Sequence, residues 1–149
     1  MNYYTSFSYI DVGDTKSDWQ RIPLADLESY RAKFNNIDFC RSVASYASQE
    51  PKDKEPMFMG ITIDLDNDDL AVVLNEARLL RDYFYRVWGL KKEEARFYYS
   101  GSRSIHIEIQ PQTLNVTPHQ KLNQYIKEVM RIIADKLELE CVDFSLYAR

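Results

Sequence analysis

The sequence predicts an α+β fold, and two patterns in the chain from residue 58 onward indicate it. Residues 58–66 and 104–109 alternate apolar and polar side chains with the period of two that is typical of a β-strand. Residues 68–89 and 118–137 repeat apolar side chains with the period of an α-helix. With 149 residues, of which 45% are hydrophobic, the chain is long enough for a compact folded core.

Residues 1–56 predict a small helical lead-in to this region. A helix-like segment opens at Ile22-Pro23 and ends near Asn35-Asn36, and a second short helix is expected at residues 39–47. Residues 49–56 are charged and contain two prolines, so we expect a surface loop. The chain is therefore divided into an N-terminal helical lead-in, residues 1–56, and a core, residues 57–149.

The predicted order of the core is strand, helix, strand, strand, helix, strand. Asp68-Asp69 begin the first helix and Gly89 ends it. Residues 96–100 and 104–109 form two strands joined by a hairpin turn at Gly101-Ser102-Arg103, and residues 141–147 form the last strand. This order matches the split βαβ unit of ferredoxin-like or RRM-like domains, in which the first strand lies between the third and the fourth.

The alternation along three neighbouring strands separates an apolar face from a polar one. The apolar face would lie against the two helices and contain Ile61, Ile63, Leu65, Ile105, Ile107, Ile109, Val142, Phe144 and Leu146. The open face would contain Gly60, Thr62, Asp64, Asp66, Ser104, His106, Glu108, Cys141, Asp143 and Ser145. The convergence of Asp64, Asp66 and Asp143 with Ser104 and His106 on this face indicates a functional site.

Three carboxylates placed together repel one another unless a cation lies among them. Ligation by oxygen alone favours a hard ion, Mg²⁺ or Mn²⁺, over zinc. Such ions hold nucleotide phosphates during phosphoryl or nucleotidyl transfer. His106 and the segment from Ser100 to Ser104, with the charge of Arg103, are suited to hydrogen-bond phosphate oxygens. Each acid alone also has an ordinary interpretation, as a solvated turn after a strand or as a charge at a strand edge.

Composition and charge limit the other function classes. A net charge of −4 and a pI near 5.2 argue against a surface that binds nucleic acid everywhere. Seven basic residues nevertheless gather between the two polar strands: Arg78, Arg81, Arg86, Lys91, Lys92, Arg96 and Arg103. A solvated helix face explains Arg78, Arg81 and Arg86 without a nucleic-acid patch.

The cysteines and the hydropathy indicate the compartment. Cys40 and Cys141 are far apart and lack metal-ligand spacing, so we expect two buried small side chains instead of a disulfide framework or a zinc site. The chain has neither a basic leader followed by an apolar stretch nor an apolar run of the roughly 20 residues that a membrane span needs. We therefore expect a cytoplasmic protein without a membrane segment.

Three short motifs resemble the signature motifs of the archaeo-eukaryotic primase superfamily. They are Asp64-Leu65-Asp66 after an apolar strand, the segment from Ser100 to His106 that opens another strand, and Val142-Asp143 in a final strand. They occur in the order of that family, on the RRM-like topology that it also uses, over residues 57–149. The resemblance implies a DNA primase or primase-polymerase, a nucleotidyltransferase that acts in DNA replication. The lead-in is similar to that of primases from plasmids, phages and integrative elements.

The resemblance also implies roles for individual residues and partners. The catalytic carboxylates that coordinate two Mg²⁺ or Mn²⁺ ions would be Asp64, Asp66 and Asp143. The residues that contact the incoming nucleoside triphosphate would be Ser100, Arg103, Ser104 and His106. The other partners would be a single-stranded DNA template and a helicase. Many relatives carry Gly where this chain has Ser104.

The end of the chain departs from the family pattern as well. Relatives continue past the third motif with basic residues and further strands, whereas this chain ends six residues after Asp143. We therefore expect an incomplete core that is inactive alone and requires a further stretch or a second half of the polypeptide.

Three alternatives stay open. A non-catalytic RRM-like module that binds single-stranded nucleic acid or a partner needs stacking aromatic residues on the open face, for which Tyr98 or Tyr99 is the candidate. A rolling-circle replication endonuclease needs a His-x-His pair and a nucleophilic Tyr on a late helix, but Ser104 stands two residues before His106. Another palm-type cyclase is supported by fold analogy alone.

Overall fold

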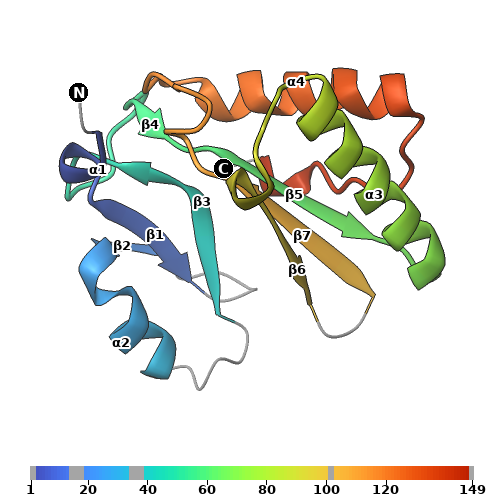
Figure 1. Cartoon of the computed structure of the whole chain (residues 1–149). Coiled ribbons are helices and arrows are strands. Elements are labelled where there is room, and N and C mark those ends of the chain that lie inside the picture. Colours follow the sequence, from blue (N-terminus) through green and yellow to red (C-terminus); the bar gives the residue numbers. More distant parts are fainter. Residues whose placement is uncertain (1–2, 14–18, 34–38, 101–102, 148–149) are drawn as a thin grey trace. The chain divides into compact units, whose positions relative to one another are not determined.

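The computed structural model describes residues 3–13, 19–33, 39–100 and 103–147 (Figure 1). It is an α+β structure with two antiparallel sheets, in agreement with the predicted fold class. The chain forms two compact units. The first contains the chain up to Met59 together with Thr117–Asn123, and the second contains Gly60–Val116 and the chain from Gln124 onward. Within the described ranges, no helix is both long enough and apolar enough to cross a membrane.

A four-stranded antiparallel sheet, in the order β2-β1-β3-β4, forms the centre of the first unit. Its strands are β1 (Tyr9–Gly13), β2 (Gln20–Pro23), β3 (Cys40–Tyr46) and β4 (Met57–Phe58). Its helical segments are α1 (Tyr3–Ser6), the 3-10 turn η1 (Leu24–Asp26) and α2 (Leu27–Lys33). Four buried side chains from strands and helix form an apolar cluster: Ile10, Val12, Ile22 and Leu27. The sheet and α2 therefore share one core.

The prediction of a helical lead-in is wrong for residues 39–47, which contain strand β3 instead of a helix. From Ser42 to Tyr46 the side chains alternate between buried and less buried positions, as expected for a strand with one covered face. Small residues such as Ala44 fit either structure by propensity, and pairing with β1 and β4 decides the outcome. The other helix is found as η1 and α2, and residues 49–56 form a loop without helix or strand.

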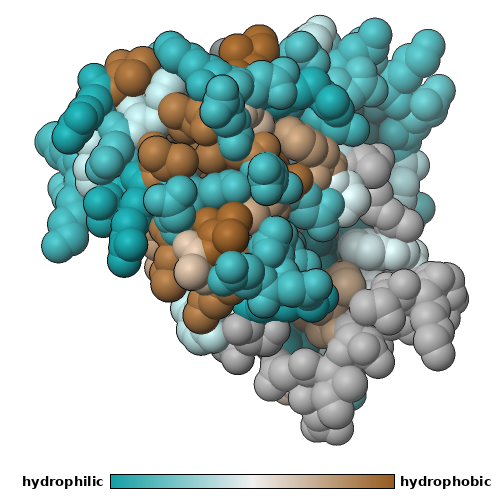
Figure 2. Space-filling view, turned by 90° about the vertical axis from the view of Figure 1, so that its right-hand side faces the viewer, coloured by the Kyte–Doolittle hydropathy of each residue, from teal (hydrophilic) through white to brown (hydrophobic). Residues whose placement is uncertain are grey.

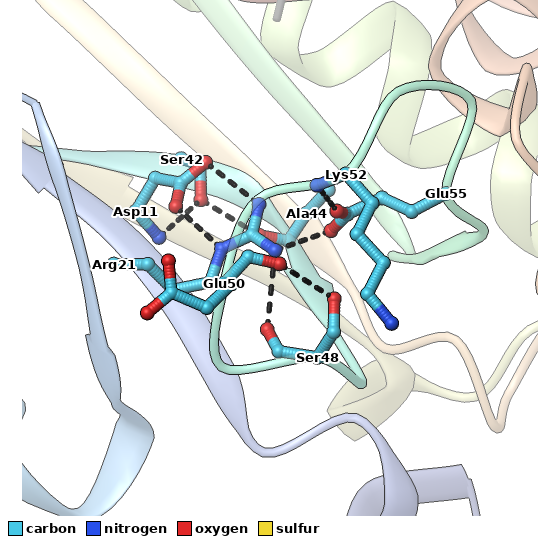
Figure 3. A network of polar contacts seen from close by, with 8 residues as sticks. All are labelled: Asp11, Arg21, Ser42, Ala44, Ser48, Glu50, Lys52 and Glu55. Atoms are coloured by element: carbon cyan, nitrogen blue, oxygen red, sulfur yellow. Dashed lines mark hydrogen bonds and ion pairs between the residues drawn. The ribbon is translucent and has the colours of Figure 1, made fainter.

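A buried arginine holds this loop to the first sheet (Figure 3). The side chain of Arg21 is 4% exposed, and its Nε donates to Oδ1 of Asp11 at 2.8 Å. Its Nη1 donates to the Glu55 carboxylate and to the carbonyl of Ser48, the latter at 3.2 Å. The guanidinium also lies 4.0 Å from the ring centroid of Tyr46. The buried charge is thus paired on several sides, which indicates a structural role in the first unit.

A three-stranded antiparallel sheet, in the order β5-β7-β6, forms the centre of the second unit. Its strands are β5 (Ile61–Asp66), β6 (Ala95–Tyr99) and β7 (Ser104–Ile109). The residues predicted to face the helices from β5 and β7 are buried: Ile61, Ile63, Leu65, Ile105, Ile107 and Ile109. The predicted hairpin turn between β6 and β7 includes residues 101–102, which lie outside the described residues.

The single strand predicted at residues 58–66 is divided at Met59-Gly60. Strand β4 pairs with β3 in the first sheet, whereas β5 pairs with β7 in the second. A Cβ on Gly60 would lie 1.9 Å from the carbonyl oxygen of Ile109 and 2.8 Å from the backbone nitrogen of Pro111. A residue without a side chain is therefore required where the chain enters β5.

The second unit contains two long helices, α3 (Leu70–Arg86) and α4 (Leu122–Leu137). The 3-10 turn η2 (Lys92–Glu94) comes directly before β6. The Asp69 side chain caps α3, and Gly89, with φ of +68°, follows its end, as the sequence predicts. Helix α4 begins later than the predicted residue 118, because His119 forms a backbone bridge with Met57. Figure 2 shows the side of the molecule on which α3 lies, where hydrophobic residues gather among hydrophilic ones.

The prediction of a strand at residues 141–147 is wrong except at one position. After α4 the chain pairs with β5 through a single bridge, between Val142 and Leu65. Residues Ser145–Tyr147 then form the 3-10 turn η3. The side chain of Asp143 accepts a hydrogen bond from the N–H of Ser145 at 2.9 Å, which favours a turn over an extended strand at this point.

Candidate functional site

Strands β5 and β7 bring the predicted polar residues to one face of the second sheet. In their antiparallel register Asp64 lies opposite His106, and Asp66 lies opposite Ser104. On the other side of β7, Tyr98 of β6 lies opposite His106. The apolar residues that alternate with them on β5 and β7 are buried, so the polar groups point to the open face. Two acids, a hydroxyl, an imidazole and a phenol therefore lie next to one another.

Asp64 lies at the centre of this group. Its Oδ1 is 3.2 Å from Nε2 of His106, which is within ion-pair distance. The same oxygen is buried and accepts no hydrogen bond of acceptable geometry from any described residue. Burial raises the pKa of Asp64; His106 opposes this shift, and the carboxylates of Asp143 and Asp66 add to it. A buried carboxylate oxygen in this state is one that a cation would stabilise.

The third predicted carboxylate, Asp143, lies beside Asp64 on the segment after α4. The N–H of Asp143 donates to the carbonyl of Asp64, and the N–H of Asp66 donates to the carbonyl of Cys141, each at 2.9 Å. The Asp143 side chain is exposed, with one oxygen bonded to the N–H of Ser145. The structure thus places Asp143 beside Asp64 at the edge of β5 that pairs with Val142, and Asp143 also has a structural role as a turn cap.

Sequence reasoning missed Glu76, a buried carboxylate on α3 that fixes this segment. Glu76 is only 4% exposed. Its two oxygens accept hydrogen bonds from the N–H of Glu140 at 3.1 and 3.0 Å, and one of them also accepts from the N–H of Cys141 at 3.0 Å. The sequence does contain a sign that Glu76 is buried: it lies three residues after Val73 and four before Leu80, on the apolar side of α3. Glu76 thereby positions the backbone that leads to Asp143.

Tyr147 is the second residue that holds this segment in place. It is 2% exposed, and its hydroxyl donates to the carbonyl of Thr62 on β5. Burial raises the pKa of the Tyr147 phenol, so it stays protonated and able to donate. The segment from Glu140 to Tyr147 is therefore fixed by α3 at one end and by β5 at the other.

Cys141 differs from the prediction. It was expected on the open face but is 3% exposed, because residues 140–143 are bonded to α3 as well as to β5 and do not keep the alternation of a strand. Burial, with the nearby Glu76 carboxylate, raises the pKa of the Cys141 thiol to about 11. The thiol is thus a neutral buried group, as the expectation of a small apolar side chain requires.

The predicted phosphate-binding residues Ser100, Arg103 and Ser104 lie near the start of β7, where Ser104 pairs with Asp66 at the end of β5. The N–H of Ser100 donates to the carbonyl of Ser104 at 3.0 Å, and their hydroxyls are hydrogen-bonded to each other. Arg103 forms ion pairs with Asp66, where Nε and Oδ1 are 3.3 Å apart, and with Asp68. The Arg103 side chain is 56% exposed, so a bound anion can replace these pairs at little cost.

Carboxylate oxygens of Asp64, Asp66 and Asp143 are the candidate ligands for a hard divalent cation, and Oδ1 of Asp64 already has Nε2 of His106 as a neighbour at 3.2 Å. In the part of the chain that the structure describes, no group of three or more His, Cys, Asp or Glu side chains is arranged so that it could hold a metal ion.

No protein-family model, no curated protein and no solved structure matches this chain.

Proposed function

We propose that the second unit is an RRM-like catalytic core of a DNA primase or primase-polymerase. The observation that carries this proposal is the partly buried carboxylate of Asp64, whose pKa is raised, with Asp66, Asp143 and His106 around it. The order β5, α3, β6, β7, α4 and a final bridge to β5 supports it, because this is the order of a split βαβ unit. The motif resemblance supports it independently.

In this proposal Asp64, Asp66 and Asp143 hold Mg²⁺ or Mn²⁺. The bound ions would lower the barrier by neutralising charge as a 3′-hydroxyl attacks the α-phosphorus of a nucleoside triphosphate and pyrophosphate leaves. His106 lies next to Asp64 with about half of its side chain exposed, so it can donate to a phosphate oxygen.

Arg103 and the paired serines supply the remaining contacts to the triphosphate. Arg103 would leave its exposed ion pairs with Asp66 and Asp68 and form ion pairs with the phosphates instead. The Asp66 carboxylate would then be free to bind the metal. The hydroxyls of Ser100 and Ser104 lie on the same end of the hairpin and can donate to phosphate. A single-stranded DNA template completes the proposed substrate set, in replication of a plasmid or phage.

Metal binding gives the first test. Thermal unfolding is measured with and without Mn²⁺ for the wild type, Asp64→Asn, Asp143→Asn and the control Asp135→Asn, which alters an exposed acid on α4. Mn²⁺ is expected to raise the Tm of the wild type and of the control by mass action, and to leave the Asp64 and Asp143 variants unchanged. Equal shifts in all four proteins would contradict the metal site.

Extension of a labelled primer on a single-stranded template gives the second test. Any nucleotide addition is expected to require Mg²⁺ or Mn²⁺. Asp64→Asn is expected to lower its rate by roughly a hundredfold or more, whereas Asp135→Asn leaves it unchanged. Extension that survives Asp64→Asn would refute the assignment of this residue.

A non-catalytic single-strand-binding module is the second candidate, because one aromatic residue does lie on the open face. Tyr98 is 45% exposed and lies opposite His106 in the β6–β7 register. A base stacked on it would give sequence-tolerant binding. Oligonucleotide binding that is lost in Tyr98→Ala, together with absent Mn²⁺ binding, would favour this module over the enzyme.

A further inference from the structure

A groove of about 1000 Å³ lies between α3 and β6, and its lining residues include none of Asp64, Asp66, His106 and Asp143. Its apolar lining includes Leu74 and Ala77 of α3 and Phe97 of β6. Leu74 is 38% exposed, and Tyr98 and Tyr99 on the strand side are 45% and 59% exposed. Large apolar surface on both walls of an open groove is typical of a binding surface.

The rim of the groove is positively charged. Four of the lining residues are basic, Arg78, Arg81, Lys92 and Arg96, and no lining residue is acidic. Arg81 contacts Asp82 at 3.5 Å, but both side chains are about half exposed, so this pair contributes little. Since the whole chain has a net charge of −4, this concentration of positive charge is a local property of the groove.

We propose that the groove binds an acidic, amphipathic helix of a partner protein. Its α3 wall extends from Leu70 to Tyr85, a length of roughly 22 Å at about 1.5 Å per residue, which matches a partner helix of similar length. The apolar side of that helix would cover Leu74, Ala77 and Phe97, and its carboxylates would meet the basic rim. The proposal is independent of the proposed catalytic function.

A protein segment fits the groove better than a nucleic-acid strand. The first part of the α3 wall provides the aliphatic side chains of Leu70 and Leu74, which a helix can cover but on which bases do not stack. The aromatic lining residues are Tyr85, Phe97, Tyr98 and Tyr99. A polynucleotide also carries its charge beyond the groove, where it would meet a protein of net charge −4. A short acidic helix places its charges on the rim alone.

Helix α3 provides matched variants for a test. Leu74 and Leu79 are both 38% exposed, but only Leu74 lines the groove, so Leu74→Glu is compared with Leu79→Glu. Arg78 and Arg86 are both exposed, but only Arg78 lines the groove, so Arg78→Glu is compared with Arg86→Glu. Far-ultraviolet circular dichroism confirms that each variant is folded before binding is measured.

The probe is a fluorescein-labelled synthetic peptide of about 16 residues, with Leu and Phe at helical spacing and Glu elsewhere. Fluorescence anisotropy with the whole chain is expected to give saturable binding that Leu74→Glu and Arg78→Glu each weaken by at least about tenfold, while Leu79→Glu and Arg86→Glu stay within about twofold. A peptide with Lys in place of Glu is expected not to bind.

Three results would overturn the proposal. One is the absence of saturable binding to the wild type. Another is equal weakening by Leu79→Glu and Leu74→Glu, which would indicate general hydrophobic adsorption. The third is displacement of the peptide by single-stranded oligo(dT) with an affinity that Arg78→Glu lowers, since this would identify the groove as a nucleic-acid surface.

Discussion

Replacement of Glu76 by Gln should loosen the segment that carries Asp143 while the rest of the second unit stays folded. Glu76 accepts three hydrogen bonds from the two N–H groups of Glu140 and Cys141, at 3.0 to 3.1 Å. In Glu76→Gln a carbonyl oxygen in the place of Oε1 can still accept from Cys141 and, at 3.1 Å, from Glu140, so the bond lost is the one from Glu140 to Oε2. The new amide NH₂ faces the N–H of Glu140, and two donors cannot satisfy each other.

The size of the effect follows from the charge and burial of this group. A buried hydrogen bond to a charged group contributes about 1.5–3 kcal/mol, and one such bond is lost outright in Glu76→Gln. For a chain of this length, 1 kcal/mol corresponds to roughly 2–4 °C in Tm, so we expect Tm to fall by roughly 3–12 °C. Glu76→Ala, which leaves both N–H groups without the carboxylate, should lose more.

The assay is thermal unfolding followed by circular dichroism, with and without Mn²⁺, for the wild type, Glu76→Gln and the control Glu128→Gln, which alters an exposed acid on α4. If Glu76 positions Asp143, Glu76→Gln reduces the Mn²⁺-induced shift in Tm as well as the Tm itself. An unchanged Tm would refute the estimate of the hydrogen bonds. A lowered Tm with the full Mn²⁺ shift would show that Glu76 stabilises the fold without positioning the site.

Three further outcomes are expected. The pKa of Asp64 is raised in the folded state, so its ionisation lowers the free energy of unfolding as pH rises above 3.8 through the folded pKa. Without metal, Asp64→Asn should therefore have a higher Tm than the wild type at pH 7. This difference in Tm should disappear below pH 3.8, where the wild-type carboxyl is protonated in both states. In His106→Ala, isothermal titration should show weaker binding of a nucleoside triphosphate, whereas the Mn²⁺ shift in Tm persists; loss of both would make His106 a metal ligand. Gly60→Ala should lower the free energy of unfolding in urea by more than about 2 kcal/mol, because its Cβ would overlap the Ile109 carbonyl; a neutral result would mean that the chain relaxes there.

The elements that the sequence predicted well are those whose pattern is local and regular. Strand β7 has the predicted bounds, and α3 has its predicted cap at Asp69 and its terminating Gly89, because alternation and helical period are strong over these stretches. The pairing of Asp64 with His106 across β5 and β7 then follows from the topology alone.

The elements that were predicted wrongly depend on partners far away in sequence. Strand β3 contains small residues that fit a helix or a strand, and its pairing with β1 determines the result. The division between β4 and β5 depends on the close approach of Ile109 to Gly60. No local pattern contains this information, because the contacting residues are tens of positions apart.

The position of Asp143 illustrates why the candidate site required the structure. A strand over residues 141–147 would have placed Asp143 on the open face by alternation, but that strand does not form. Instead, the backbone bond to Asp64, the Glu76 carboxylate and the Tyr147 hydroxyl hold the segment against β5. These anchors keep Asp143 next to Asp64 although the two carboxylates repel each other. Burial is the main cause of the raised pKa of Asp64, with a smaller contribution from Asp143, so a neutral residue at this position would avoid a cost that the proposed cation would offset.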